Sequence, residues 1–400
     1  MLPLFTRKRV AVTIPVDGAS YAVMSTLVVM PTETLERTTT DANRSHQASF
    51  TVQPRVGETI PDLCGRLVAQ LRAVSATPLH LLAFGDCQAS AAVAAALARA
   101  ESRLDCPITW VEGGACHHAP IAGLQVQTFS GPVERIVVNG RSVGSVFTDG
   151  GARQCVIGGL GPDDQTGSRA EQTARTLGNL QSALARAGFE LADVVRTWYY
   201  LDDILAWYDD FNRVRTGIYS HVKFKTGSLP ASTGIGARNP AGAALTLAAW
   251  AYRPRSGRAY AAEVASPLQC PAPAYGSSFS RAMEMATNSG RQLFVSGTAS
   301  IAPGGKTRWV DNMRKQVELT MEVVLAILGS RGFTLNDLSR ATAYFRHAAD
   351  AAVFAEWLAT RRLTRLPIVS AEAHICRDDL LFELEAEAIT QTIFPPPLRK

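Results

Sequence analysis

Residues 168–200 read SRAEQTARTLGNLQSALARAGFELADVVRTWYY, and residues 311–344 read DNMRKQVELTMEVVLAILGSRGFTLNDLSRATAY. Each stretch contains a helical pattern, a Gly-Phe pair, a short acidic turn and a β-rich segment, in that order. The stretches align at a constant offset of 144 residues, which pairs Gly188 with Gly332, Phe189 with Phe333, Arg196 with Arg340 and Tyr200 with Tyr344. Because the offset holds across the turn, the sequence predicts an internal structural repeat.

The local pattern in the first of these stretches supports a helix followed by a strand. Ser168 and Glu171 form a capping-box sequence, and Gly188 is a helix-stop signal. In both copies a second helix rich in aromatic residues follows the strand, and a Leu-Pro pair then opens another strand before a final one. The repeat therefore has the order α-β-α-β-β.

A weaker third copy lies upstream, between residues 60 and 129. Its segments IPDLCGRLVAQLRAV, LHLLAF, SAAVAAALARAE, PITWVEG and GLQVQTF follow the same order, so that Pro107 corresponds to Pro230 and Pro367. Extended sequence precedes each copy: RVAVTIP and YAVMSTLVVM before the first, RIVVNGRSVGSVF with its Asn139-Gly140 hairpin signal before the second, and RQLFVSGTASI before the third. The complete unit is predicted to be β-β-α-β-α-β-β.

Two helices on one face of a mixed sheet leave the other face to be buried, and three such faces can close around a pseudo-threefold axis. We therefore predict an α+β protein of three fused units in a pseudo-trimer, with mixed sheets and helices on one face. The predicted boundaries are residues 1–130 for a degenerate unit, 131–255 for a second unit and 256–393 for a third.

The composition narrows the functional classes. Forty Lys and Arg residues against 35 Asp and Glu give a net charge of +5 without a basic run, which disfavours nucleic-acid binding. Seven cysteines without a C-x-x-C pair, and no apolar run long enough for a membrane span, lead us to expect a cytoplasmic protein that does not bind membranes. The Cys116-His117-His118 run lacks metal-ligand spacing and the glycine-rich pieces lack a nucleotide-binding motif, so we expect neither metal nor cofactor.

The repeated Gly-Phe-x-x-x-Asp turn, the Leu-Pro strand and the closing ELEAEAI strand resemble the Rid (YjgF-type) family. That family forms homotrimers with a ligand site between subunits, so the resemblance implies three Rid-like units fused in one chain. Rid deaminases carry a substrate-binding arginine two residues after the strand-opening proline, whereas this chain has other residues at all three positions: Thr109, Ser232 and Val369. The glutamate of the family's last strand is kept once, as Glu383, in the third unit, and the other copies have apolar or amide residues near Leu247 and Gln125.

A fused Rid-like chain with one such glutamate, preceded by Cys376, is similar to the chorismatase family, which hydrolyses chorismate and releases pyruvate. The stretch APAYGSSFSRAMEM (residues 272–285), the FVSGTASI and ATAYFR strands and the segment from the cysteine to ELE carry this resemblance. The cysteine resembles the branch that makes 3-hydroxybenzoate, and the longer amino-terminal segment resembles variants that also release 4-hydroxybenzoate. The resemblance implies a cofactor-free enzyme of secondary metabolism in which Glu383 is the general acid and Cys376 steers the product.

Glu383 and Cys376 each have a catalytic and a purely structural interpretation. Cleavage of the vinyl ether of chorismate requires a proton at the enol carbon, and a carboxylic acid buried beside an anionic substrate can stay protonated near neutral pH. Alternatively, Glu383 belongs with Glu385 and Glu387 to the outward-facing half of an alternating strand. Cys376 is alternatively a small buried hydrophobe, and the sequence leaves both readings of the cysteine open.

The two carboxylates of chorismate call for cationic partners, and Arg281 and Arg346 are the candidate substrate-binding arginines. The arginines of the second unit, Arg153, Arg213 and Arg215, are interpreted as ordinary solvated side chains. Five further residues complete the predicted site: Tyr275, Ser280 and Tyr344 as hydrogen-bonding walls, and Gly297 and Ala299 as small residues that leave room for the ring. Core packing of the tyrosines and a strand bend at the glycine are the alternatives.

Two other functions stay open from the sequence. One is a Rid-like imine or enamine hydrolase, which the missing arginine disfavours, and the other is a non-catalytic Rid-like module that binds a small metabolite or a partner protein. For the leading hypothesis the expected partner is the small molecule chorismate. The expected assembly is a monomeric pseudo-trimer or a loose homo-oligomer.

Overall fold

The computed structural model describes residues 8–16, 19–27, 47–100, 104–115, 119–255 and 257–391. Strands β1 (Lys8–Val16) and β2 (Ala19–Leu27) form an antiparallel pair in a two-stranded sheet, within a separate compact unit (Met1–Arg44). The two strands expected before the first copy are therefore present. They differ from the expectation in pairing with each other and not with the sheet of the first unit.

The second copy of the repeat forms a six-stranded sheet with the order β12-β11-β13-β10-β9-β8. Strands β11 and β12 are parallel and the other neighbours are antiparallel, so the sheet is mixed. Its elements are β8 (Val133–Val138), β9 (Arg141–Asp149), β10 (Ala152–Leu160), α3 (Arg169–Arg186), β11 (Val194–Leu201), α4 (Tyr208–Tyr219), β12 (Ala231–Gly236) and β13 (Leu245–Pro254).

The third copy has the same strand order, since β14-β15-β16-β19-β17-β18 matches the second sheet strand for strand. The short β6 (Gly114–Ala115) from the first copy extends this sheet by pairing with β18. Its own elements are β14 (Tyr260–Val264), β15 (Ala282–Thr287), β16 (Gly290–Ala299), α5 (Met313–Ser330), β17 (Leu338–Phe345), α6 (Ala351–Thr360), β18 (Ile368–Glu372) and β19 (Phe382–Thr390).

The first copy is reduced to a four-stranded sheet with the order β3-β7-β4-β5, which matches the last four positions of the larger sheets. Its elements are β3 (Gln47–Val52), α1 (Ile60–Val74), β4 (Thr77–Gly85), α2 (Ser90–Ala100), β5 (Ile108–Val111) and β7 (Ile121–Phe129). Each of the three larger sheets has a pair of helices. No helix of the described chain is long and apolar enough to cross a membrane.

Local hydrogen bonds explain why the repeat keeps its register. Gly188 and Gly332 end α3 and α5 with φ values of 67° and 72°, a conformation that glycine adopts without the Cβ penalty. In both copies the backbone N–H of the next residue then donates to the carbonyl five residues back, Phe189 N to Leu184 O and Phe333 N to Leu328 O, both at 2.9 Å. Ser168 and Glu171 form the expected capping box at the start of α3. The predicted turn at Asn139-Gly140 joins β8 to β9, with positive φ at both residues.

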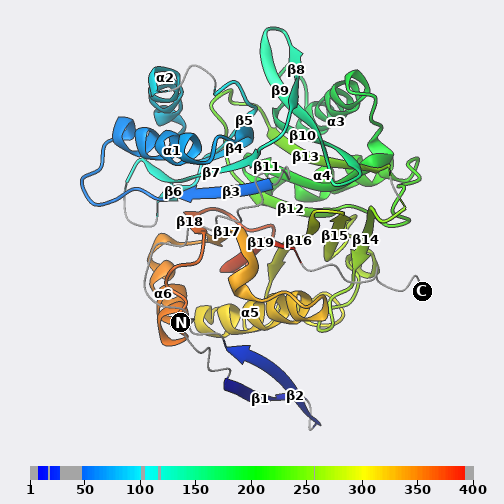
Figure 1. Cartoon of the computed structure of the whole chain (residues 1–400). Coiled ribbons are helices and arrows are strands. Elements are labelled where there is room, and N and C mark those ends of the chain that lie inside the picture. The colour runs from blue at the N-terminus through cyan, green and yellow to red at the C-terminus, as the bar shows by residue number, and fades with distance from the viewer. Residues whose placement is uncertain are drawn as a thin grey trace. The chain divides into compact units, whose positions relative to one another are not determined.

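The three sheets share one central core. Figure 1 shows α1 and α2, α3, and α5 and α6 on the outside of the sheets. Each sheet packs one face against its own helices, in three separate apolar clusters. The opposite faces meet in a fourth cluster to which all three copies contribute large side chains: Phe84 and Phe129, Trp198 and Trp250, Phe294 and Tyr344. This arrangement confirms the predicted α+β class with three fused units and helices on one face of each sheet.

A buried set of charges lies within this central region. Arg196 of β11 pairs with Glu385 of β19 at 2.7 Å, and Arg340 of β17 pairs with Glu387 of β19 at 2.5 Å. Gln127 of β7 donates to Glu387 at 2.9 Å, so all three sheets take part. Charges removed from water destabilise the fold unless each is matched by a partner, so this network fixes how the sheets meet.

We predict that Arg340→Ala lowers the free energy of unfolding by about 3 to 5 kcal/mol, because Glu387 is left as a buried charge without its guanidinium. The control is Arg314→Ala, which breaks the exposed Arg314–Glu356 pair on the helices of the same unit and should cost less than about 1 kcal/mol. Urea unfolding of both variants measures the difference, and equal losses would show that the buried pair contributes no more than a surface pair.

Candidate active site

The register of β19 decides where its glutamates lie. Glu383 is opposite Ala299 of β16 and Tyr344 of β17, and Glu383, Glu385 and Glu387 alternate onto one face. All three are at least 95% buried, because their face of the sheet is turned toward the other units, while Leu384, Ala386 and Ala388 face the helices. The alternation expected from the sequence is correct, but the glutamates do not form a solvated face.

The sheet register also corrects the counterparts of Glu383 in the other copies. The Tyr344–Glu383 pair corresponds to Tyr200 opposite Thr246 and to Phe84 opposite Gly123. The expected neighbours Leu247 and Gln125 are therefore displaced. Leu247 faces the helices because a shift of one residue changes the face of a strand, and Gln125 corresponds to Glu385. Neither true counterpart is an acid, so one of the three copies carries the glutamate.

Glu383 lies where the second unit meets the third. Strand β12 runs beside β16: Ser232 N donates to Ser296 Oγ at 2.9 Å, and Gly297 N donates to Thr233 Oγ1 at 3.0 Å. A register shift between Val295 and Thr298 in β16 exposes the Gly297 N–H for this contact. A methyl group on Gly297 would collide with the Glu383 carboxylate, so glycine at this position leaves the space that the carboxylate occupies.

The surroundings of the Glu383 carboxyl group favour its protonated form at neutral pH. Burial and the negative charge of Glu385 raise the pKa of Glu383 to about 8, against the opposing influence of Arg196 and Arg281. Among the described residues, none forms a hydrogen bond or an ion pair with the Glu383 carboxyl group, so no direct donor stabilises its ionised form. A buried carboxylic acid in this state can donate a proton at pH 7.

Cys376 is near Glu383, in the segment between β18 and β19. Gly236 N, at the end of β12, donates to His374 O at 2.8 Å and so attaches this segment to the second unit. The half-buried Cys376 packs beside Ile375, Leu380 and Ala299. Burial and the nearby Glu383 raise the pKa of the thiol to about 12, so the side chain is a neutral S–H group and not a thiolate at neutral pH. The structure therefore places the cysteine both in a small apolar cluster and beside the acid.

Arg281 and Arg215 are buried guanidinium groups on the two sides of this interface. Arg281 donates from Nε to Cys270 O at 3.1 Å and lies over the Tyr275 ring at 5.3 Å, while its Nη2 has no hydrogen-bond partner. Arg215 of α4 donates to Asn212 Oδ1 at 2.7 Å, and its Nε has none. Within the described chain neither forms an ion pair. Two desolvated cations without carboxylate partners are suited to bind an anion.

Arg215 and Tyr208 are candidate site residues that the sequence analysis did not propose. Arg215 was interpreted as solvated, but it is on the buried face of α4 with Phe211 and Tyr219, at a spacing of four residues. An arginine within such an apolar stripe is the signal that could have identified it. Tyr208, at the start of α4, is beside Cys376 and close enough to Glu383 that both acidic groups, with burial, raise the pKa of its phenol.

Three predicted substrate-binding residues have other partners in the structure. Arg346 donates to the backbone carbonyls of Arg377 and Asp378, so it holds the segment after Cys376 in place. Ser280 donates to Leu229 O at 2.5 Å, which joins the second and third units. Tyr344 donates to Glu385 Oε1 at 3.1 Å. The Tyr275 ring, by contrast, contacts two guanidinium groups, Arg281 at 5.3 Å and Arg377 at 5.8 Å from its centroid. Gly297 and Ala299 both lie beside Glu383.

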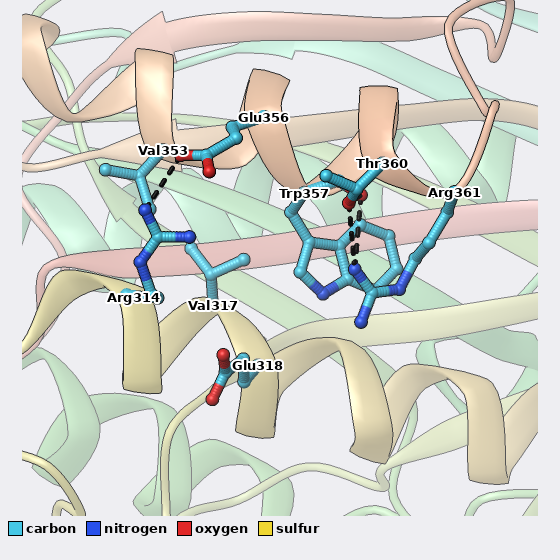
Figure 2. Close-up of a pocket in the computed structure, with 8 residues that line it drawn as sticks. All are labelled: Arg314, Val317, Glu318, Val353, Glu356, Trp357, Thr360 and Arg361. Atoms are coloured by element: carbon cyan, nitrogen blue, oxygen red, sulfur yellow. Dashed lines mark hydrogen bonds and ion pairs between the residues drawn. The ribbon is translucent and has the colours of Figure 1, made fainter.

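A surface groove between α5 and α6 is separate from this cluster. Figure 2 shows the Arg314–Glu356 pair at one end of this groove and Trp357 with Arg361 at the other. All of its lining residues come from one unit, and none belongs to the cluster around Glu383. In the described parts of the chain no three His, Cys, Asp or Glu side chains are grouped as metal ligands. Cys116, His117 and His118 lie outside the described residues.

Comparison with known proteins agrees with this architecture. The Endoribonuclease L-PSP family model, which describes the Rid-type unit, matches residues 153–245. A 3-hydroxybenzoate synthase from Streptomyces hygroscopicus is 29% identical over 247 residues, which cover 55% of this chain and 70% of that protein. The crystal structure of a chorismatase superposes with a TM-score of 0.63 at 21% identity, over 86% of this chain and 98% of its own.

The fold is therefore that of a chain built from fused Rid-like units, closed as in the solved chorismatase. Together these matches confirm the resemblance to the chorismatase family that the sequence motifs indicated.

We predict a pH dependence of stability from the raised pKa of Glu383. The folded chain holds this proton more tightly than the unfolded chain, so the stabilisation is complete below a pH of about 4.5 and is lost as pH rises toward 8. Glu383→Gln removes this titration. Between about pH 5 and pH 7, the free energy of unfolding of the wild type should fall relative to the variant by roughly 2 to 3 kcal/mol. Urea unfolding at both pH values measures this, and parallel pH profiles would contradict the raised pKa.

Proposed function

We propose that this protein is a chorismatase that converts chorismate to 3-hydroxybenzoate and pyruvate, with Glu383 as the general acid and Cys376 steering the product. The observation that carries the proposal is the buried Glu383 carboxyl, whose raised pKa favours the acid form at neutral pH, near the Arg281 guanidinium, which has no ion-pair partner in the described chain. Arg215, a second buried guanidinium without an ion pair there, lies beside Tyr208, the neighbour of Glu383 and Cys376. The similarity to a 3-hydroxybenzoate synthase and to the chorismatase fold supports the choice of substrate.

The charges of the site suit a small dianion. Chorismate carries one carboxylate on its ring and one on its enolpyruvyl ether. Arg281 comes from the third unit and Arg215 from the second, so the two cations can hold the two ends of one substrate. The hydrogen bond between Thr216 and Ser278, at 2.6 Å, ties α4 to the segment that carries Arg281 and so keeps both sides together. Because one chain supplies both sides, a monomer contains the complete proposed site.

The proposed chemistry begins with the proton of Glu383. Transfer of this proton to the methylene carbon of the enolpyruvyl group turns that group into a better leaving group. The ring–oxygen bond then breaks, pyruvate leaves with the ether oxygen, and the neighbouring ring hydroxyl closes onto the ring as it loses its proton to Glu383. The resulting epoxide-like intermediate opens to the phenol. The two products contain all the atoms of chorismate, so no net water is consumed and Glu383 ends in its starting state.

The Cys376 thiol is proposed to act in the last of these steps. Its raised pKa keeps the S–H proton in place at neutral pH, so it acts as a weak proton donor and not as a nucleophile. Together with the adjacent Tyr208 it would direct how the intermediate opens.

A Rid-like imine hydrolase has less support. The positions of the deaminase arginine are held by Thr109, Ser232 and Val369, all buried and none cationic.

We predict that Glu383→Gln lowers the rate of pyruvate release from chorismate by about 100-fold to 10,000-fold, because the amide is nearly isosteric but cannot donate a carboxylic proton. A coupled pyruvate assay measures the rate, with the exposed Glu263→Gln as the control that should behave as wild type. Turnover of Glu383→Gln near the wild-type rate would remove this residue from the mechanism.

We predict that Arg281→Ala and Arg215→Ala each raise the KM for chorismate by at least about tenfold. Each replacement removes a charge-assisted hydrogen bond to a substrate carboxylate, worth roughly 1.5 to 3 kcal/mol. Arg99→Ala, at an exposed position on α2, serves as the matched control. If both variants keep the wild-type KM, the substrate carboxylates are bound elsewhere.

We predict that Cys376→Ala changes the product more than the rate of pyruvate release, because Glu383 protonates the ether before the thiol acts. Chromatography of the aromatic products should show part of the 3-hydroxybenzoate replaced by 4-hydroxybenzoate or a dihydroxycyclohexadiene. An unaltered proportion of 3-hydroxybenzoate, together with a loss of stability of roughly 1 kcal/mol, would assign the cysteine to packing alone.

A further inference from the structure

Glu383 and Glu385 are neighbours on the same face of β19 and differ sharply in their contacts. Both side chains are at least 95% buried, and they are two residues apart, about 6 to 7 Å along a strand. Two carboxylates this close inside a protein do not both ionise easily, because like charges repel strongly where water is excluded. The contacts of each therefore decide which one carries the charge.

Three donors converge on Glu385. Arg196 Nη2 lies 2.7 Å from Glu385 Oε2, Thr233 Oγ1 lies 2.7 Å from the same oxygen, and Tyr344 OH lies 3.1 Å from Oε1. A guanidinium and two hydroxyl donors stabilise the ionised form of this carboxylate. Glu385 therefore holds a fixed negative charge.

Glu383 has no such donors within the described chain. The groups that influence its protonation come from several strands, helices and loops. Burial and, next, the charge of Glu385 on the same strand favour the neutral acid, whereas Arg196 and Arg281 favour the anion. The Arg196 guanidinium is already paired with Glu385, and we place Arg281 at a substrate carboxylate. Tyr344 of β17 is opposite Glu383, and Tyr208 of α4 and Cys376 also lie near it. The next charged or titratable groups are Arg215 beside Tyr208, and Tyr275 and Arg377 beside Cys376.

The other copies of the repeat offer an internal comparison. The position of Glu385 is occupied by Gln125 in the first unit and by Ala248 in the second. These are the two copies in which Glu383 is replaced by Gly123 and Thr246. Among three copies of one strand, the second carboxylate thus occurs only where the first one does.

We propose that Glu385 is a positioning residue whose fixed charge keeps Glu383 in its protonated form, with Arg196 and Thr233 of the second unit holding Glu385 in place. The catalytic role of this arrangement rests on the function proposed above. The protonation state of Glu383 does not, because it can be measured in the absence of substrate. This arrangement gives the buried Arg196–Glu385 pair a role in preparing the acid as well as in joining the two units.

Infrared titration of the substrate-free protein tests the proposal. The C=O stretch of a protonated buried carboxyl should be present in the wild type at neutral pH and absent in Glu383→Gln. If the band persists in Glu383→Gln, the proton is on another carboxyl and the proposal is wrong. This measurement needs only the wild type and one nearly isosteric variant, so it decides the point even where other variants fold poorly.

The charge of Glu385 is tested by following the same band through pH in Glu385→Gln. Its titration midpoint should move to lower pH by at least about one unit, since a like charge beside Glu383 is removed. Glu387→Gln is the matched control, because this residue is equally buried and ion-paired but two residues further along the strand. Its midpoint should move at most half as far, and Glu385→Asp, which keeps the charge, should restore most of the wild-type value.

Equal shifts in Glu385→Gln and Glu387→Gln, or none in a variant whose circular dichroism shows the native fold, would overturn the proposal. With chorismate, the pH above which pyruvate release is lost should fall in Glu385→Gln by the same amount as the infrared midpoint. If the infrared shift occurs and the wild type releases no pyruvate, the proposal for Glu385 stands and the proposed chorismatase function fails.

Discussion

The ion pair between Arg196 and Glu385 is the contact on which the arrangement of the site depends. Its partners come from β11 of the second unit and β19 of the third, and both are buried. Such a pair is stable only when the geometry offsets the cost of desolvation, and here Thr233 and Tyr344 supply the additional donors. The same contacts fix the interface beside which Glu383 lies.

Fusion of three copies of one unit in a single chain has a direct consequence for the site. A symmetric homotrimer presents identical residues at all of its interfaces, whereas fused copies can differ. In this chain Glu383, Thr246 and Gly123 occupy equivalent strand positions in the three sheets. The acid, its neighbouring carboxylate and the Arg281 guanidinium therefore lie at the interface of the second and third units, and the first unit contributes mainly to the shared core.

Much of the architecture could be predicted from the sequence because the signals are local. The capping box at Ser168, the helix stops at Gly188 and Gly332 and the hairpin at Asn139-Gly140 each depend on contacts between residues a few positions apart. The alternation of β19 likewise follows from strand geometry, and it placed Glu383 and Glu385 on one face. The family resemblance then singled out Glu383, which periodicity alone did not.

The sequence by itself determined the repeat, the class of the fold and the residue that the proposed chemistry centres on. Only the tertiary structure decided which side chains surround Glu383. Its neighbour Glu385, for example, is paired with Arg196, which is 189 positions away in the chain. The tertiary structure placed Tyr208 beside Cys376 and Glu383, with Arg215 next to Tyr208. It also assigned Arg346 to backbone carbonyls and replaced Leu247 by Thr246 as the counterpart of Glu383. The physical reason is that burial and charge pairing between units depend on how whole sheets pack against one another, and a local sequence pattern does not encode contacts between segments far apart in the chain.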